Sequence, residues 1–336
     1  MKSLVCVEPG RFAYRDAATP EKLAGHTVLK IKQVGICGTD IHAFEGTQPF
    51  FEYPRVLGHE IAAEIVDTDA AGFAEGDVIT IIPYLNCGHC IACRRGATNC
   101  CENIAVCGVH VDGGIAAYFR VPNANLVHGQ GLSVDQLALV EPLAIGAHGV
   151  RRARVEPGEF VLVVGAGPIG LGTMEFARIA GANVIALDVN TDRLAFCKDR
   201  LAIPYTVNGT EEDVTAMLRE ITHGDMPTVV IDCTGNLQAI NQSFNYLAHS
   251  GRYVLIGLQK GTIQVSHPAF HKREGTLMSS RNATKADFDH VITNLKKGLI
   301  DPTHYITHRI PFEQLGAKFD TLLRPESGVI KAMVIC

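Results

Sequence analysis

The sequence predicts an α/β protein with two domains, one a β-barrel-like domain and the other a doubly wound parallel sheet. With 336 residues, the chain has the length of two domains at roughly 150 residues each. Strand-like segments dominate its first part, whereas apolar strands alternate with helical patterns from Phe160 onward. The 47% hydrophobic content is ample for two packed cores.

The first domain is predicted from a series of strands. Residues 27–34 alternate apolar and polar side chains, residues 61–66 are nearly all apolar, and residues 77–82 form a further strand that ends at Pro83. Residues 116–121 are also strand-like. These patterns are typical of β-structure, and they place residues 37–60 on the loops between strands.

Cys37, His59 and Glu60 are candidate ligands of a catalytic zinc ion. Thiolate, imidazole and carboxylate are the side chains that bind Zn²⁺, and a catalytic zinc keeps one position open beside three protein ligands. The alternative is that Cys37 is a small buried hydrophobe and that His59 and Glu60 are ordinary loop residues. The other zinc and cofactor signals favour the metal site.

A second metal site, of structural type, is predicted in a lobe at about residues 84–104. Four closely spaced thiolates can close a tetrahedral shell around zinc with no open position. The four cysteines are Cys87, Cys90, Cys93 and Cys101. Spacing alone leaves Cys100 open as the fourth ligand, and we interpret His89 as a solvated loop residue.

Composition and charge narrow the class of partner. No apolar segment reaches the roughly 18 residues that a membrane span needs, and the opening residues 1–6 lack a long apolar stretch. The net charge of −5 is modest and is not gathered into blocks, which indicates neither a nucleic-acid nor a membrane surface. We therefore expect a soluble cytoplasmic protein that acts on small molecules, with its eleven cysteines serving metal binding rather than disulfides.

The second domain begins with a dinucleotide-binding fingerprint. The apolar strand 160–164 leads directly into a glycine-rich turn and then a helical pattern to about Gly181. Glycines let the backbone approach a pyrophosphate at the helix N-terminus and let the helix pack closely on the strand. The turn comprises Gly165, Gly167, Pro168, Ile169 and Gly170.

Asp188 predicts the choice of dinucleotide. It ends the next apolar strand, where a carboxylate accepts hydrogen bonds from the adenosine ribose hydroxyls. Its charge also repels a 2′-phosphate, and Arg193 is the first basic residue that follows it. The sequence therefore favours NAD over NADP, with Arg193 included among the cofactor-binding candidates.

Later segments complete both domains. Strands at 228–232, 253–257 and 276–280 alternate with a helix near 237–247, which continues the parallel sheet. A helix after Asn282 and a final strand at 329–335 do not continue this rhythm, so we expect them to return to the first domain. The predicted domains are residues 1–145 with 282–336, and residues 146–281.

The motifs together resemble the zinc-dependent medium-chain alcohol dehydrogenases, over essentially the whole chain. Within that family the sequence is similar to the polyol and sugar dehydrogenases, most of all to bacterial L-galactonate and L-gulonate 5-dehydrogenases. The resemblance implies a GroES-like catalytic domain and a Rossmann NAD-binding domain. The family resemblance rests on residues 37–42, 58–60, the four-cysteine lobe, 141–143 and 165–170. The narrower resemblance, to the L-galactonate and L-gulonate enzymes, rests on residues 48–60 and 270–284.

The resemblance also implies roles at the catalytic zinc. Cys37 and His59 would hold the metal, Glu60 would exchange with water as a ligand, and Glu141 would be the fourth ligand or bridge through water. Without this context, Glu141 before Pro142 reads as a helix-start residue. Asp40 would accept the second hydrogen bond of His59 and fix its tautomer.

The implied reaction is zinc-assisted oxidation of an alcohol by NAD, in a site between the two domains. The alcohol proton would leave through Thr39 and His42, and the hydride would pass to the nicotinamide. A zinc-ribbon binding module would explain the four cysteines but not the fingerprint. A zinc-free quinone-reductase-type relative would lack the ligands.

The substrate implied by the narrower resemblance is a sugar acid oxidised at carbon 5. Arg281, expected at the end of the last parallel strand, is the candidate partner of its carboxylate, because Arg pairs with carboxylates in bidentate fashion. The alternative role of Arg281 is contact with the cofactor pyrophosphate. A neutral polyol or L-threonine is the alternative substrate, and the resemblance implies a homotetramer or homodimer.

Overall fold

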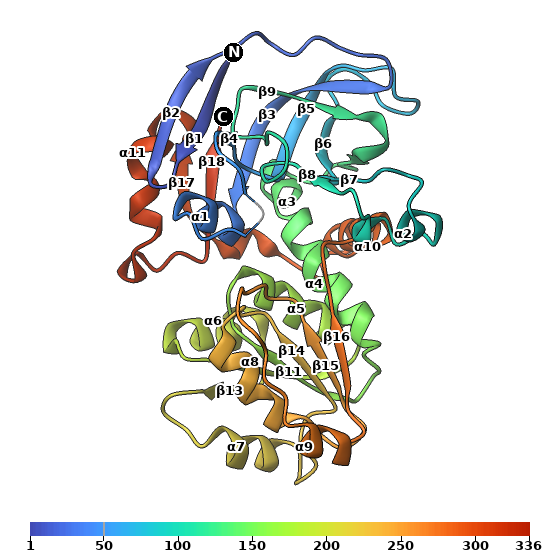
Figure 1. The fold of residues 1–336 in the computed structure, drawn as a ribbon, viewed down its shortest axis with the longest axis vertical. Coiled ribbons are helices and arrows are strands. Elements are labelled where there is room, and N and C mark those ends of the chain that lie inside the picture. Colours follow the sequence, from blue (N-terminus) through green and yellow to red (C-terminus); the bar gives the residue numbers. More distant parts are fainter. Residues whose placement is uncertain (50) are drawn as a thin grey trace. The chain divides into compact units, whose positions relative to one another are not determined.

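A computed structural model of the chain describes residues 1–49 and 51–336, so that Phe50, part of the 48–60 segment discussed above, lies outside the described residues. The chain forms two compact units (Figure 1). Unit 1 comprises Met1–Glu141 and Thr284–Cys336, and unit 2 comprises Pro142–Ala283. The predicted α/β class is confirmed.

Unit 1 is built around a mixed seven-stranded sheet with the order β10-β6-β5-β3-β18-β17, in which β9 also pairs with β3. The C-terminal strand β18 therefore lies beside β3, antiparallel to it. The strands are β3 (His26–Ile36), β5 (Glu60–Asp67), β6 (Val78–Ile81), β9 (Tyr118–Pro122), β10 (Leu126–His128), β17 (Ile306–Pro311) and β18 (Lys331–Ile335).

Two smaller sheets complete the β-structure of unit 1, and both were missing from the sequence-based prediction. One has the order β2-β1-β4, and the other pairs β7 with β8. Their strands are β1 (Lys2–Glu8), β2 (Arg11–Asp16), β4 (Arg55–Val56), β7 (Tyr84–Leu85) and β8 (Ala105–Val106). The helices of unit 1 are α1 (Gly38–Phe44), α2 (Ile91–Arg94), α3 (Val134–Ala138), α10 (Lys285–Lys296) and α11 (Phe312–Leu322).

One hydrophobic core joins these elements. Alternate residues of β3 and β5, such as Leu29 and Ile61, are fully buried in it, as expected for strands with one face on the core. Helix α11 adds Phe319, whose ring contacts Phe12 and Phe44 at centroid distances of 4.9 Å. These contacts fix the N-terminal strands and α1 to the core, and with them the residues next to Cys37.

Unit 2 contains a parallel six-stranded sheet with the order β13-β12-β11-β14-β15-β16. The chain moves outward in one direction from β11 and then returns to continue in the other, which is the doubly wound pattern of dinucleotide-binding sheets. The strands are β11 (Phe160–Val164), β12 (Asn183–Asp188), β13 (Tyr205–Asn208), β14 (Val229–Asp232), β15 (Arg252–Leu255) and β16 (Thr276–Ser279).

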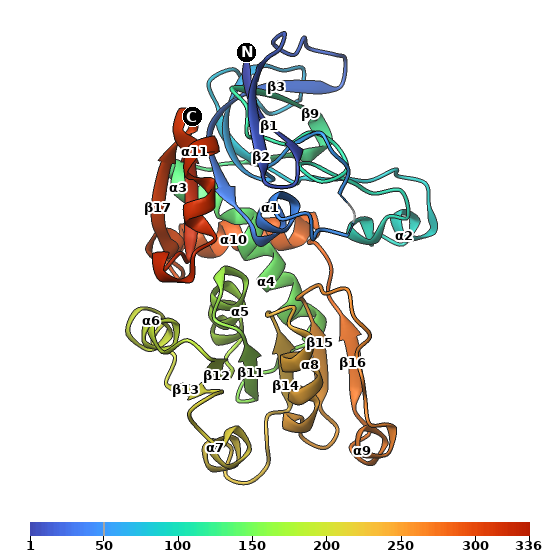
Figure 2. The ribbon, with the colours of Figure 1, turned by 60° about the vertical axis from the view of Figure 1, so that its left-hand side comes forward.

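Helices cover both faces of this sheet (Figure 2). Every residue from Val161 to Val164 is buried, because a parallel sheet covered on both faces has no solvent-facing side. The helices assigned to this sequence region are α4 (Val140–Ala153, which begins in unit 1), α5 (Pro168–Ile179), α6 (Thr191–Leu201), α7 (Val214–Ile221), α8 (Leu237–Ser243) and α9 (His267–Lys272).

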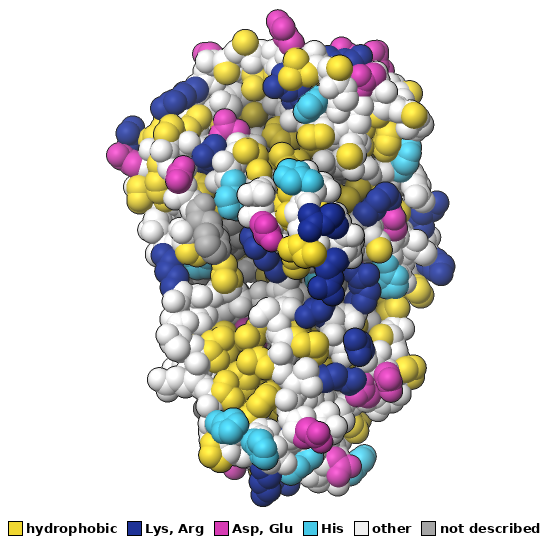
Figure 3. Space-filling model, turned by 45° about the vertical axis from the view of Figure 1, so that its right-hand side comes forward, with side chains coloured by type: hydrophobic (Ala, Val, Ile, Leu, Met, Phe, Trp, Pro, Cys, Tyr) yellow, Lys and Arg dark blue, Asp and Glu magenta, His cyan; other side chains and the backbone are white. Residues whose placement is uncertain are grey.

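The surface shows local differences that the net charge does not reveal. On the face drawn in Figure 3, Lys and Arg side chains gather more closely than the acidic ones. A net charge of −5 thus coexists with locally basic surface, which attracts anions. Among the described residues, no helix combines the length and apolar character needed to cross a membrane.

Candidate metal centres and cofactor-binding edge

The sequence had suggested that residues 37–60 lie on loops. Cys37 instead caps a short helix, α1. The Asp40 carboxylate accepts a hydrogen bond from the Cys37 backbone N–H at 2.9 Å, which completes a capping box at the start of α1. Such reciprocal capping satisfies donors that a helix start leaves unpaired. Thr39 and His42 therefore lie three residues apart on one helix, where side chains at this spacing are neighbours.

Glu60 is the first residue of β5 and His59 directly precedes it, and both side chains are buried. Ligand atoms of Cys37, His59 and Glu60 all lie within 4.8 Å of one another. Gly58, just before them, has a φ of 93° and abuts Ile115 and Val34, so a side chain there would clash. The tight turn at Gly58 thus delivers the imidazole and the carboxylate to the thiol of Cys37.

Asp40 does not make the predicted hydrogen bond to His59. Its Oδ1 lies 4.0 Å from His59 Nδ1, which is an ion-pair distance but is too long for a hydrogen bond. Its oxygens instead accept from the backbone N–H groups of Cys37 and Gly58. Asp40 therefore acts on His59 through its charge and through the backbone that it holds in place.

The electrostatics of His59 are dominated by its neighbours. Burial lowers the pKa of His59, but the adjacent Cys37, Asp40 and Glu141 more than offset this, and the net pKa lies well above its ordinary value. Concentrated negative charge around a buried imidazole is what a divalent cation would neutralise. The buried His59 Nδ1 has no hydrogen-bond partner among the described residues.

Two buried partners of the carboxylates were not predicted from the sequence. The Lys331 ammonium donates to both oxygens of Glu60, at 2.7 and 2.8 Å. The Tyr84 hydroxyl donates to Glu141, and burial followed by the Glu141 charge raises the pKa of Tyr84 well above its ordinary value. The signal that could have revealed Lys331 is a lysine at the start of a strongly apolar strand.

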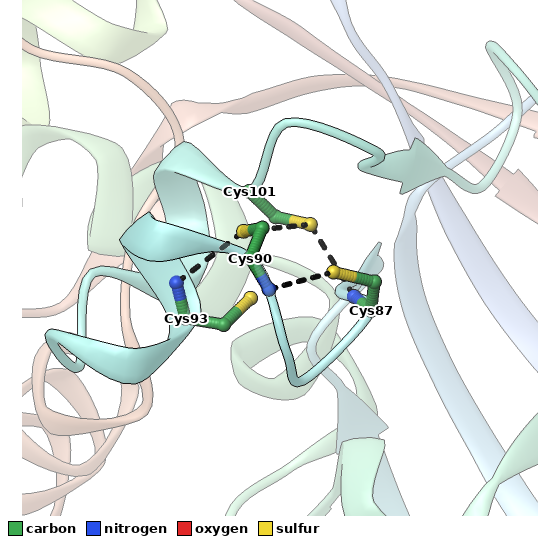
Figure 4. Close-up of side chains that lie close together, drawn as sticks. All are labelled: Cys87, Cys90, Cys93 and Cys101. Atoms are coloured by element: carbon green, nitrogen blue, oxygen red, sulfur yellow. Dashed lines mark hydrogen bonds between the residues drawn. The ribbon is translucent and has the colours of Figure 1, made fainter.

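The second cluster consists of four thiols that point toward one another around α2 and the turn that follows it (Figure 4). The sulfur atoms of Cys87, Cys90, Cys93 and Cys101 lie within 4.8 Å of one another. Cys100 is exposed, so the structure selects Cys101 as the fourth member. His89 is also exposed, and its Nδ1 lies 2.9 Å from the Cys87 carbonyl oxygen.

The backbone around Cys87 and Cys90 favours their thiolate forms, whereas the pKa of Cys101 is raised to about 11. Backbone N–H groups of His89 and Cys90 lower the pKa of Cys87 to about 6, and the backbone N–H of Cys93 lowers the pKa of Cys90. The thiolate is the metal-binding form of cysteine. Four thiolates fit a structural zinc, and the thiol, imidazole and carboxylate of the first cluster fit a catalytic zinc with an open position.

In unit 2 the glycine-rich turn joins β11 to α5. Gly165 has a φ of 99°, and a Cβ on Gly170 would lie 1.8 Å from the Gly165 carbonyl oxygen. Only glycine fits both positions. Gly167 caps α5, Pro168 occupies its first turn, and Ile169 follows within the helix. The backbone at the α5 N-terminus is thus left open for an anion.

Asp188 ends β12 beside this turn. One of its oxygens accepts from the Ala166 backbone N–H at 2.6 Å and the other from that of Asn190 at 2.8 Å. Arg193 is half-buried in the first turn of α6. Arg281 is exposed just past the end of β16.

Sequence comparisons agree with this combination of fold and sites. Residues 24–131 match the alcohol dehydrogenase GroES-like domain, and residues 168–297 match the zinc-binding dehydrogenase family. The chain belongs to the zinc-type medium-chain alcohol dehydrogenase family, as the resemblance of its motifs had indicated.

Within this family, the chain is similar to sugar-acid and polyol dehydrogenases. The chain is 44% identical over 336 residues to the L-galactonate-5-dehydrogenase of Escherichia coli K12, which covers 99% of this chain and 98% of the relative. It is 31% identical to the sorbitol dehydrogenase of Halalkalibacterium halodurans, over 92% of this chain and 92% of the relative. A crystal structure of RspB from E. coli CFT073, solved with NADH, superposes with a TM-score of 0.93 at 29% identity, covering 100% of this chain and 99% of that chain.

Proposed function

We propose that this protein is an NAD-dependent dehydrogenase that oxidises a secondary hydroxyl, at carbon 5, of a sugar acid of the L-galactonate or L-gulonate type. The observation that carries the proposal is the 44% identity to the E. coli L-galactonate-5-dehydrogenase across nearly the full length of both chains. The cluster of Cys37, His59 and Glu60 supplies the ligands that such chemistry needs. Unit 1 is the catalytic domain and unit 2 the cofactor domain in this proposal.

Each cluster has its own task. Cys37, His59 and Glu60, with Glu141 beside them, would hold the catalytic zinc, and the four cysteines would hold a structural zinc. A bound zinc ion acts as a Lewis acid that lowers the pKa of an alcohol hydroxyl at its open position. Tyr84 orients Glu141 by the hydrogen bond that it donates.

The surroundings of His42 suit a route for the alcohol proton. His42 is exposed on α1, with its Nδ1 3.0 Å from the Thr47 hydroxyl and 3.5 Å from a Glu45 carboxylate oxygen. The half-buried Thr39 hydroxyl precedes it on the same helix. We assign Thr39 to accept the proton from the substrate side and His42 to pass it to water.

NAD is the cofactor that Asp188 favours, because its carboxylate pairs with ribose hydroxyls and repels a 2′-phosphate. Replacing Asp188 with alanine should lower kcat/KM for NAD by about 10- to 100-fold, since a hydrogen bond to a charged group contributes about 1.5–3 kcal/mol. The same change should shift the preference toward NADP. Initial rates with both cofactors measure this.

The matched control is Asp192→Ala, which removes an exposed acid from the first turn of α6 and should leave the cofactor preference unchanged. Faster turnover of the unaltered enzyme with NADP than with NAD at equal concentration would contradict the assignment.

The sugar-acid carboxylate requires a cationic partner, and we propose Arg281 for it. A guanidinium presents two parallel N–H donors to a carboxylate, which a lysine does not. Arg281 is exposed at the end of the cofactor-domain sheet. The competing role for Arg281 is contact with the cofactor pyrophosphate.

A substrate panel tests the proposal. NADH formation should be fastest, by kcat/KM, with one of L-galactonate, L-gulonate and L-idonate, and slower with sorbitol, galactitol and L-threonine. Arg281→Ala should raise KM for the acid by about tenfold or more, as loss of a charged hydrogen bond predicts, and leave KM for NAD unchanged. The control is Lys272→Ala, an exposed cation of α9. A neutral polyol as best substrate, or a raised KM for NAD alone, would contradict the carboxylate assignment.

A neutral polyol is the second candidate substrate, supported by the 31% identity to a sorbitol dehydrogenase. We further propose a cytoplasmic homotetramer or homodimer, for which the family resemblance is the support.

A further inference from the structure

Lys331 is a buried cation that contacts the candidate metal ligand Glu60 and the end of strand β3. Its Nζ lies 2.7 and 2.8 Å from the two oxygens of Glu60 and 3.1 Å from the Ile36 carbonyl oxygen. The side chains of Lys331 and Glu60 are 1% and 0% exposed.

The strand register explains how the two side chains meet. Glu60 on β5 pairs with Gly35 on β3, and Gly35 pairs in turn with Met333 on β18. Directly paired residues project from the same face of a sheet, and so does Lys331, two positions before Met333. A Cβ on Gly35 would lie 1.9 Å from Glu60 Oε2. The missing side chain of Gly35 therefore lets the carboxylate cross β3 to reach Lys331.

The Glu60 carboxylate thus has two competing partners. It lies within 4.8 Å of the ligand atoms of Cys37 and His59, yet both of its oxygens are engaged by Lys331. We propose that Lys331 is a positioning residue that competes with the catalytic zinc for Glu60 and so keeps Glu60 an exchangeable ligand. This inference rests on the proposed assignment of the catalytic zinc to this cluster. Its consequence is that a coordination position stays open for the substrate hydroxyl.

The test uses Lys331→Met, which keeps most of the side-chain volume and removes the ammonium. The released carboxylate should remain on the metal, so zinc at this site should leave to excess EDTA about 10–100-fold more slowly, the range that residues contacting metal ligands typically control. The visible d–d absorption of the cobalt-substituted enzyme should weaken as coordination rises from four to five. Lys331→Arg, which keeps the charge, should behave like the unaltered protein.

A second background keeps the test decisive if Lys331→Met does not fold. Glu60→Gln with Lys331→Met replaces the buried ion pair by two neutral groups, and neutral replacements of such pairs are well tolerated. Adding Lys331→Met to Glu60→Gln should leave EDTA release unchanged, because the proposed effect runs through the carboxylate. The proposal would be overturned if Lys331→Met slowed zinc release to EDTA as much in the Glu60→Gln background as in the unaltered protein. It would also be overturned if folded Lys331→Met showed unchanged zinc release and an unchanged cobalt spectrum. None of these measurements uses a substrate, so they are independent of the sugar-acid assignment.

Discussion

Replacing Cys37 with serine is expected to lower kcat by on the order of a thousandfold or more. The thiol is one of three clustered ligands, and a zinc ion contributes several kcal/mol of transition-state stabilisation, with tenfold in rate for each 1.36 kcal/mol. Zinc content should fall from two ions per chain to one, because the four-cysteine cluster is separate. Steady-state rates and metal analysis of the purified protein measure both effects.

Folding of this variant should be unaffected, since Cys37 is half-buried at a helix start whose capping also uses the Asp40 carboxylate. Circular dichroism and thermal unfolding check this point. Cys100→Ser, which alters an exposed cysteine, is the control. Retention of most of the activity with the catalytic zinc still bound would show that the ligand assignment is wrong.

Replacing Cys101 with serine is expected to destabilise unit 1 while its neighbour Cys100 tolerates the same change. Cys101 is 2% exposed and lies among the other three thiols, whereas Cys100 is exposed. Loss of a structural metal is one of the changes that lower the free energy of unfolding by about 4 kcal/mol or more. For a domain of this size that corresponds to roughly 8–16 °C in Tm.

Calorimetry of the two serine variants side by side, with zinc analysis, measures this difference. Cys90→Ser should resemble Cys101→Ser, because its sulfur lies 3.9 Å from that of Cys101. Equal Tm values and two zinc ions per chain in both the Cys100 and the Cys101 variant would contradict a four-thiolate site.

Local patterns were enough to predict the α/β class and the glycine-rich turn at 165–170. The strand 160–164 is continuously apolar, and glycines recur where the backbone must turn tightly, as Gly165 and Gly170 do. These features depend on contacts between residues close in sequence. The N-terminal strands β1 and β2 were missed, and α1 was mistaken for a loop although Asp40 stands three residues after Cys37 as a capping signal.

The sequence by itself determined the family, the two sets of zinc-ligand candidates and the dinucleotide fingerprint, because each is written in a spacing of a few residues. Only the tertiary structure decided that Cys101 rather than Cys100 joins the four-thiol cluster. It also decided that Asp40 accepts hydrogen bonds from backbone N–H groups. Likewise, only the tertiary structure showed that Lys331 donates to Glu60 and Tyr84 to Glu141. The Glu60–Lys331 pair spans 271 positions of the chain and forms only because β18 is placed beside β3. Such pairing follows from the packing of the whole sheet, which no local spacing encodes.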